Sequence, residues 1–223
     1  MSAELPTGSL IAGRCRIAGP ASSRPRSKAL LMGLLLPMLT QAAHGVDEPN
    51  EKARLDTLNA ELARQADTAR LGLAALSAQT TPEGVQLVDQ IRPAERLARN
   101  RARTEHFLAG FDEYCRNYKQ MLLAHGERLK QLRLTWAGLQ EQRDALLNDI
   151  RHSSALNDKY CANTQALGGR RIALFSLLQA RVGMWHVQGD QIRFSQANDT
   201  AQYQRLMGDM DRISTALRKP ATP

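Results

Sequence analysis

Aromatic residues are scarce in this 223-residue chain, at 4% of the composition, and glycine and proline are modest at 15 and 9 residues. β-Sandwiches and barrels draw on β-branched and aromatic residues and on many turns, so this composition disfavours both. The chain is instead rich in leucine, alanine, glutamine and arginine, which are good helix formers. We therefore expect an all-α protein.

The sequence also lacks the short motifs that accompany common enzyme chemistry. It contains no glycine-rich phosphate loop, no serine-centred nucleophile elbow and no His-Glu-x-x-His metal motif. The adjacent carboxylates Asp112 and Glu113 would point to different faces of a helix and could not act together. We therefore expect a non-enzymatic protein with no catalytic residue, metal site or cofactor.

The longest apolar run, Ala29–Leu39, has only 11 residues, whereas a membrane-spanning helix needs about 20. Arg24, Arg26 and Lys28 precede the run, and small residues follow it as far as Gly45. This pattern is typical of a secretory signal. We predict that residues 1–45 form a leader and that cleavage near Gly45 leaves a periplasmic or secreted bacterial protein without a transmembrane anchor. The alternative is an organelle presequence, because arginine and serine are common in this segment and acids are rare.

The formal net charge of the whole chain is +8. The predicted leader holds five basic residues and one acidic residue, so residues 46–223 keep 25 basic and 21 acidic residues and a charge of +4. A surplus of this size does not indicate a nucleic-acid partner.

The mature part, residues 46–223, reads as one helical domain. Pro82 suits the first turn of a helix and Pro93 ends one, because proline pushes the preceding residue out of helical geometry. Loop-forming residues near position 152 and the pair Gly168-Gly169 indicate further breaks. The expected helices cover about 51–78, 82–92, 94–151 (with a break near 136–138 as the alternative), 156–167, 170–188 and 199–218.

A row of large residues at alternating steps of three and four dominates the central part of the sequence. Such spacing predicts a helix with a coiled-coil seam. Together with the other helices it predicts an elongated antiparallel helical bundle with coiled-coil heptad character. The row comprises Phe107, Phe111, Tyr114, Tyr118, Leu122, His125, Leu129, Leu132, Trp136, Leu139, Arg143, Leu146 and Ile150.

Candidate core residues come from this row and from the apolar stretch after residue 170. We expect the histidine of the row to be packed or partly exposed in the seam, because no metal-type partner is spaced from it. The predicted core comprises Leu129, Leu132, Trp136, Leu139, Leu146, Ile150, Phe175, Leu178, Val182 and Trp185.

A docking surface is predicted at the start of the long central helix. Arg96, Arg99 and Arg103 are spaced to share one helical face and could steer an acidic partner; the alternative is a solvated face paired with Glu95 and Glu105. The aromatic ladder that follows is either core packing or a groove for a partner helix. The ladder comprises Phe107, Phe111, Tyr114 and Tyr118.

Two cysteines, Cys115 and Cys161, follow the predicted leader. In an oxidising compartment such a pair suggests a disulfide. If residues 94–151 formed one straight helix, Cys115 would lie about 50 Å from its far end, and Cys161 could not come within the roughly 7 Å that a disulfide requires. The bond therefore demands a turn near Trp136–Gly138, whereas a straight helix leaves two free thiols or a bond between chains.

The function that these features favour is protein–protein interaction. We expect an exported helical subunit or accessory of an envelope, secretion or conjugation assembly. The alternatives are a periplasmic chaperone or inhibitor that binds one client, and a helical-bundle ligand sensor with a cavity near Trp185. A seam that binds a partner and a seam that binds a second copy of the chain look the same in one sequence, so a homo-oligomer is a further alternative.

Overall fold

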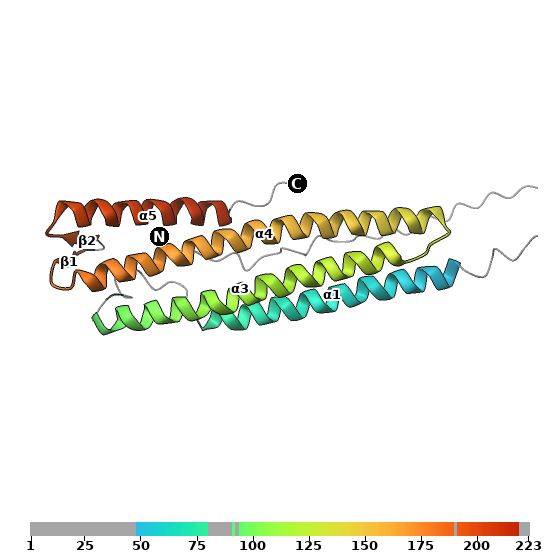
Figure 1. Ribbon diagram of the computed structural model, residues 1–223, viewed down its shortest axis with the longest axis horizontal. Coiled ribbons are helices and arrows are strands. Elements are labelled where there is room, and N and C mark those ends of the chain that lie inside the picture. The colour runs from blue at the N-terminus through green and yellow to red at the C-terminus, as the bar shows by residue number, and fades with distance from the viewer. Residues whose placement is uncertain (1–47, 80–90, 92–93, 190, 219–223) are drawn as a thin grey trace, which may run out of the picture.

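The computed structural model describes residues 48–79, 91, 94–189 and 191–218. This part of the chain is a helical bundle with one small antiparallel hairpin, and its long helices lie side by side (Figure 1). The predicted leader, and the predicted helix over 82–92 apart from Ile91, lie outside the described residues. The elements are α1 (Glu48–Ala78), α3 (Ala94–Gln131), α4 (Ala137–Ala180), β1 (Trp185–Gln188), β2 (Gln191–Phe194) and α5 (Ala197–Arg218).

Helix α1 packs along α3 through a row of leucines and alanines on one face. The row follows the spacing of three and four that a helix needs to keep one face apolar. Within α1 only Glu51 and Leu55 are buried. The other members of the row are partly buried: Leu58, Leu62, Ala66 and Ala69.

The central segment is a helical hairpin. Helix α3 ends at Gln131 and α4 begins at Ala137, with Trp136 in an extended conformation at the N-cap. Leu132 and Leu134 of the connecting loop are buried, so the loop closes the end of the bundle with apolar side chains. The predicted break in the segment 94–151 is therefore correct, although it begins at residue 132 and not at 136.

Helix α4 runs without interruption for 44 residues, so the predicted breaks at 152–158 and at Gly168-Gly169 are wrong. Of the residues that suggested loops, Asn157 and Gly168 face the interior of the bundle, whereas His152, Asp158 and Gly169 are exposed. Asn157, Thr164 and Gly168 are all buried within α4. They allow two helices to approach closely, and a glycine in a packed helix costs only about 1 kcal/mol relative to alanine.

The predicted helix over 170–188 ends early, at Ala180, and a β-hairpin follows. Gly183 has a φ of 84°, a backbone conformation that suits glycine and stops the helix. Residues 185–194 then alternate apolar and polar side chains, and β1 pairs with β2 in the register Trp185 to Phe194. Gly189, with a φ of 58°, stands at the tight turn.

The buried residues form two separate apolar clusters. The loop-end cluster lies where α1, α3 and α4 meet, and includes Leu129, Leu132, Leu139 and Ile150, with Leu146 packed against it. The hairpin-end cluster gathers around the end of α4. It comprises Ile91, Leu97, Leu174, Phe175, Leu177, Leu178, Ile192 and Leu206, with Trp185 partly buried against it.

Two residues predicted to be core are exposed instead. Trp136 is 39% exposed and Val182 is 57% exposed. The prediction assumed that both residues lie within helices. Trp136 instead caps α4, and Val182 lies in the turn between α4 and β1. Outside a helix the spacing of three and four no longer fixes which side faces inward.

A buried ion pair fixes α5 against the end of α4. The Arg181 guanidinium Nε lies 3.1 and 3.0 Å from the two carboxylate oxygens of Asp199. Asp199 is only 1% exposed, whereas the Arg181 side chain is 42% exposed. The pair therefore joins the C-cap of α4 to the first turn of α5.

Within the described residues, we find no helix whose length and apolarity together would suffice to cross a lipid bilayer.

Candidate functional site

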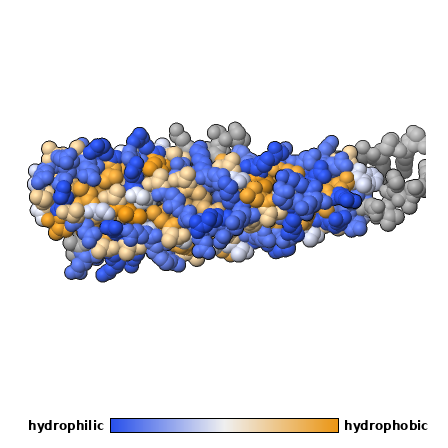
Figure 2. Space-filling view, in the orientation of Figure 1, coloured by the Kyte–Doolittle hydropathy of each residue, from blue (hydrophilic) through white to orange (hydrophobic). Residues whose placement is uncertain are grey.

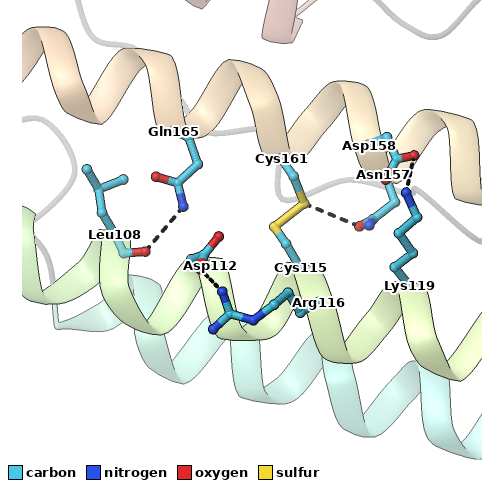
Figure 3. Close-up of a disulfide and its surroundings, with 9 residues drawn as sticks. All are labelled: Leu108, Asp112, Cys115, Arg116, Lys119, Asn157, Asp158, Cys161 and Gln165. Atoms are coloured by element: carbon cyan, nitrogen blue, oxygen red, sulfur yellow. Dashed lines mark hydrogen bonds and ion pairs between the residues drawn. A yellow bond between two sulfur atoms is a disulfide. The ribbon is translucent and has the colours of Figure 1, made fainter.

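Cys115 of α3 and Cys161 of α4 form a disulfide with a Cα–Cα distance of 6.1 Å (Figure 3). The intramolecular bond predicted from the cysteine count is therefore confirmed, together with the turn that it demands. The Lys119–Asp158 ion pair at 2.8 Å lies one turn further along the same two helices. The disulfide sits between the loop-end and hairpin-end clusters, and neither cluster includes Cys115.

The face of α4 around the disulfide is polar and small. Asn157, Cys161, Thr164 and Gly168 follow one another at steps of four, three and four, and all four are buried. Asn157 has no hydrogen-bond partner for Nδ2, and its Oδ1 contacts Cys161 Sγ at 3.6 Å. Apolar burial in this section comes from α3, where Phe111 and Tyr118 flank Cys115, and the covalent bond adds to the few apolar contacts that α4 offers here.

Gly168 of α4 lies directly against the Leu108 side chain of α3. A Cβ atom built on Gly168 would lie 2.5 to 2.8 Å from three side-chain atoms of Leu108, whereas one built on Gly169 would meet nothing within 4 Å. Gln165 Nε2 also donates a hydrogen bond to the Leu108 carbonyl at 3.3 Å (Figure 3). Glycine at 168 is therefore required by contact and not by backbone conformation.

The aromatic ladder predicted as a docking candidate stacks inside the bundle. Phe111 and Tyr118 are buried, and Phe111 also meets Tyr160 of α4 edge-on, with ring centroids 5.8 Å apart. Burial raises the pKa of Tyr114 to about 12, and Tyr118 and Tyr160 add to the shift. The ladder, Phe107, Phe111, Tyr114 and Tyr118, is held by stacked contacts between successive rings. Its use as an open groove is wrong for Phe111 and Tyr118, because this chain's own helices already cover them.

The predicted arginine surface lies near the start of α3, where Arg96, Arg99 and Arg103 are all exposed. The neighbouring Arg101 pairs with Glu105 at 2.9 Å along the helix. No ion pair within 4 Å involves Arg99 or Arg103 in the part of the chain that the structure describes. These two guanidinium groups are therefore accessible to an acidic partner.

A shallow groove that the sequence did not predict follows the line between α1 and α3. It has two hollows of about 540 and 620 Å³ that meet at Arg128. Arginine supplies its charged lining, whereas the one acidic group beside it, Glu61, is already bonded to Arg128. The lining residues include Arg54, Leu58, Arg64, Gln65, Met121 and His125.

Glu61 and Arg128 form the principal polar link between the middle of α1 and α3. Both guanidinium nitrogens Nη1 and Nη2 donate to the carboxylate, each at 2.8 Å. These hydrogen bonds lower the pKa of Glu61. The two residues lie 67 positions apart, and nothing in the sequence reveals the register that brings them together.

His125 lies beside this pair and is only 2% exposed. Its Nε2 atom has no hydrogen-bond partner. Burial and then the Arg128 guanidinium lower the pKa of His125, and Glu61 opposes this effect. The imidazole is therefore held neutral under α1, as a packed seam residue.

A second carboxylate of α1, Glu51, binds the loop between α3 and α4. Its two oxygens accept from the Thr135 amide at 2.9 Å and the Thr135 hydroxyl at 2.8 Å. The Thr135 amide bond chiefly lowers the pKa of Glu51, and the Trp136 amide contributes. Because Trp136 is the N-cap of α4 and makes no side-chain cap bond, this carboxylate takes over part of the capping.

The polar groups placed by the fold thus serve mainly to join helices. Among the described residues, no cluster of three or more histidine, cysteine, aspartate or glutamate side chains could hold a metal ion. Both hollows are open grooves along α1 and α3, and Trp185 does not line them. The Trp185 indole Nε1 instead donates to the Leu178 carbonyl at 2.8 Å.

Comparisons of this chain with protein-family models, with curated proteins and with solved structures find no match.

Proposed function

We propose that this chain is an exported, non-enzymatic helical protein that binds a protein partner in the bacterial cell envelope. It would act as a subunit or accessory of an envelope, secretion or conjugation assembly. The observation that carries the proposal is the exposure of Arg99 and Arg103 near the start of α3, outside any ion pair of the described chain. Exposed charges of one sign raise the rate at which a complementary partner is captured and fix its orientation.

The scaffold behind this surface would be an elongated coiled coil of α3 and α4. The large buried residues of α3 from Phe111 to Leu129 recur at steps of seven, four, three and four, and the buried residues of α4 from Ile150 to Gly168 recur at the same steps. This spacing supports heptad packing, in which one helix presents its seam to the other. The α3 residues are Phe111, Tyr118, Leu122, His125 and Leu129.

The first test is a cross-linked pull-down from intact cells that produce the full chain with a C-terminal tag. Several components of one envelope assembly among the captured proteins would support the proposal. A single soluble client would favour a chaperone or inhibitor, and links between copies of this chain alone would favour a homo-oligomer; either result would overturn the assembly role.

Charge-reversal variants give the test a site. Arg99→Glu with Arg103→Glu should reduce capture of the partner at least about tenfold, because two attractive contacts become repulsive. The matched control is Arg193→Glu with Arg205→Glu, which reverses two exposed arginines on β2 and α5. Equal capture by both double variants would reject the arginine surface as the docking site.

Export is tested separately. Cell fractionation should place the tagged protein outside the cytoplasm, and N-terminal sequencing should find a mature start near Val46. A full-length cytoplasmic product would contradict the proposed location without bearing on the arginine surface.

A further inference from the structure

Helix α1 buries few of its residues, as α5 does. Two of its 31 residues are buried, Glu51 and Leu55, whereas ten of the 44 residues of α4 are buried. Helix α1 contains no cysteine, and the disulfide of the described chain joins α3 to α4. The polar links of α1 therefore carry an unusual share of its attachment.

The strength of those polar links depends on pH. Glu51 holds the loop and the N-cap of α4, Glu61 holds Arg128, and His125 is buried uncharged beneath the same contact. Protonation of either carboxylate removes the acceptor charge from its bonds. Protonation of His125 places a second positive charge beside Arg128 in a site with little water.

We propose that α1 is an acid-released arm, which stays on α3 at neutral pH and detaches on acidification while the disulfide keeps α3 and α4 together. The proposal stands on the contacts of α1 and does not depend on the proposed partner. It makes α1 a pH-controlled cover for the α3 face that includes Met121 and His125, which line the hollow between α1 and α3.

The surrounding charges leave this direction unchanged. His125 is influenced by Arg128 on its own helix and by Glu61 on α1, and Arg64 of α1 lines the same hollow. From α4, the side chains that approach the adjacent Gly126 are Ile150 and Leu147, which are uncharged. The single acidic neighbour of His125, Glu61, is itself neutralised as the pH falls.

Glu51 has a comparable setting. Its partners are the Thr135 amide and hydroxyl and the Trp136 amide, and the charge that acts on it is that of Arg54 on α1. Protonation of the Glu51 carboxylate weakens its hydrogen bonds to these neutral donors, because the negative charge is what strengthens the bonds.

The sign of each contribution gives a release in two steps. The pKa of His125 is lowered from 6.5, so the detached form binds a proton first and the attachment weakens as the pH falls below about 6.5. The pKa values of Glu51 and Glu61 are lowered from 4.5, so their contribution is complete above that value and is lost below it. Release therefore begins with the histidine and is completed by the carboxylates.

Hydrogen exchange of backbone amides tests this on the full-length oxidised protein. Protection factors, corrected for the intrinsic pH dependence of exchange, are compared at about pH 7.5, 5.5 and 3.5. Protection of α1 amides should fall about threefold or more at the first step and a further tenfold or more at the second, whereas the α4 amides around the disulfide should change by less than about twofold. A parallel loss in all helices, or no loss in α1, would overturn the proposal.

Two variants separate the steps. His125→Leu replaces the titrating side chain by an apolar one and should abolish the loss at about pH 5.5 while leaving the loss at about pH 3.5. Glu51→Gln with Glu61→Gln should lower the protection of α1 already at about pH 7.5 and flatten the second step.

The matched control is Asp56→Asn, since Asp56 is an α1 carboxylate whose ion pair with Lys52 lies within the helix. It should keep both steps. If His125→Leu fails to fold, the glutamine double variant still decides the second step, and a profile identical to that of the unmodified protein would overturn the role of the carboxylates.

Discussion

Removal of the Cys115–Cys161 disulfide should be the most damaging small change to this fold. The bond closes a loop across a sequence separation of 46, and the loop-entropy relation for that length corresponds to about 4 kcal/mol of stability. Packing makes up only part of this loss, because Phe111 and Tyr118 of α3 are buried on either side of Cys115, whereas the facing section of α4 buries Asn157, Thr164 and Gly168. We expect Cys115→Ala with Cys161→Ala to lower the free energy of unfolding by about 4 kcal/mol.

Urea unfolding followed by far-UV circular dichroism measures this loss, with the chemically reduced parent protein as a second route to the open form. The transition should also broaden, because the loop-end and hairpin-end clusters then lose their covalent connection and can unfold separately. A loss below about 1 kcal/mol, or an equally sharp transition, would refute the reasoning that packing makes up only part of the loss.

Three further predictions concern single residues. Gly168→Ala should lower the free energy of unfolding by about 1 kcal/mol, because the clash with α3 outweighs the gain in helix propensity. Gly169→Ala should raise it by about 1 kcal/mol. Thermal unfolding of the two variants measures both changes, and equal shifts would contradict the close contact at Gly168. Asp199→Ala should cost about 2 kcal/mol, because Arg181 loses a charged hydrogen-bond acceptor, and urea unfolding that leaves stability unchanged would show that the pair is only a surface contact. Tyrosinate absorbance should rise well above pH 10 in the folded protein, because burial raises the pKa of Tyr114 to about 12, and a single transition at the value of the urea-unfolded chain would contradict that burial.

The sequence predicted the parts of the fold that depend on local periodicity and on a single covalent constraint. The spacing of three and four from Phe107 to Leu129 predicts a helix correctly, because an apolar stripe of that period and length is typical of a helix and not of a strand. The cysteine pair then required a turn, since Cys161 could reach Cys115 only if the chain reversed. Neither inference needed knowledge of the other helices.

Predictions failed where a residue's role depended on its neighbours in space. Gly168 looks like a helix breaker until Leu108 is placed against it. The apolar character of the segment after Ala180 predicts a helix, although the alternation around Gly189 is a hairpin pattern that the sequence does contain. On one face of the molecule, hydrophilic residues interrupt the apolar ones along its length (Figure 2). This surface pattern likewise depends on how the helices pack.

One part of the candidate site could be predicted from the sequence and another part could not. Exposure of Arg99 and Arg103 follows from their place on one helix, and so could be anticipated. The groove along α1 and α3 could not, because it depends on the register that sets Glu61 against Arg128. Two long helices can slide by one heptad with similar apolar contacts, and only the polar partners distinguish the registers.

The position of the disulfide also determines what happens when the backbone is cut. Cys115 and Cys161 close a covalent ring that includes the loop at 132–136, in which Arg133 is exposed. A trypsin cut after Arg133 opens this ring without releasing a fragment, so the product should migrate as one species until a reductant separates the piece with α1 and α3 from the piece with α4 and α5. The molecule can therefore lose the continuity of its backbone between α3 and α4 and still keep both halves covalently joined.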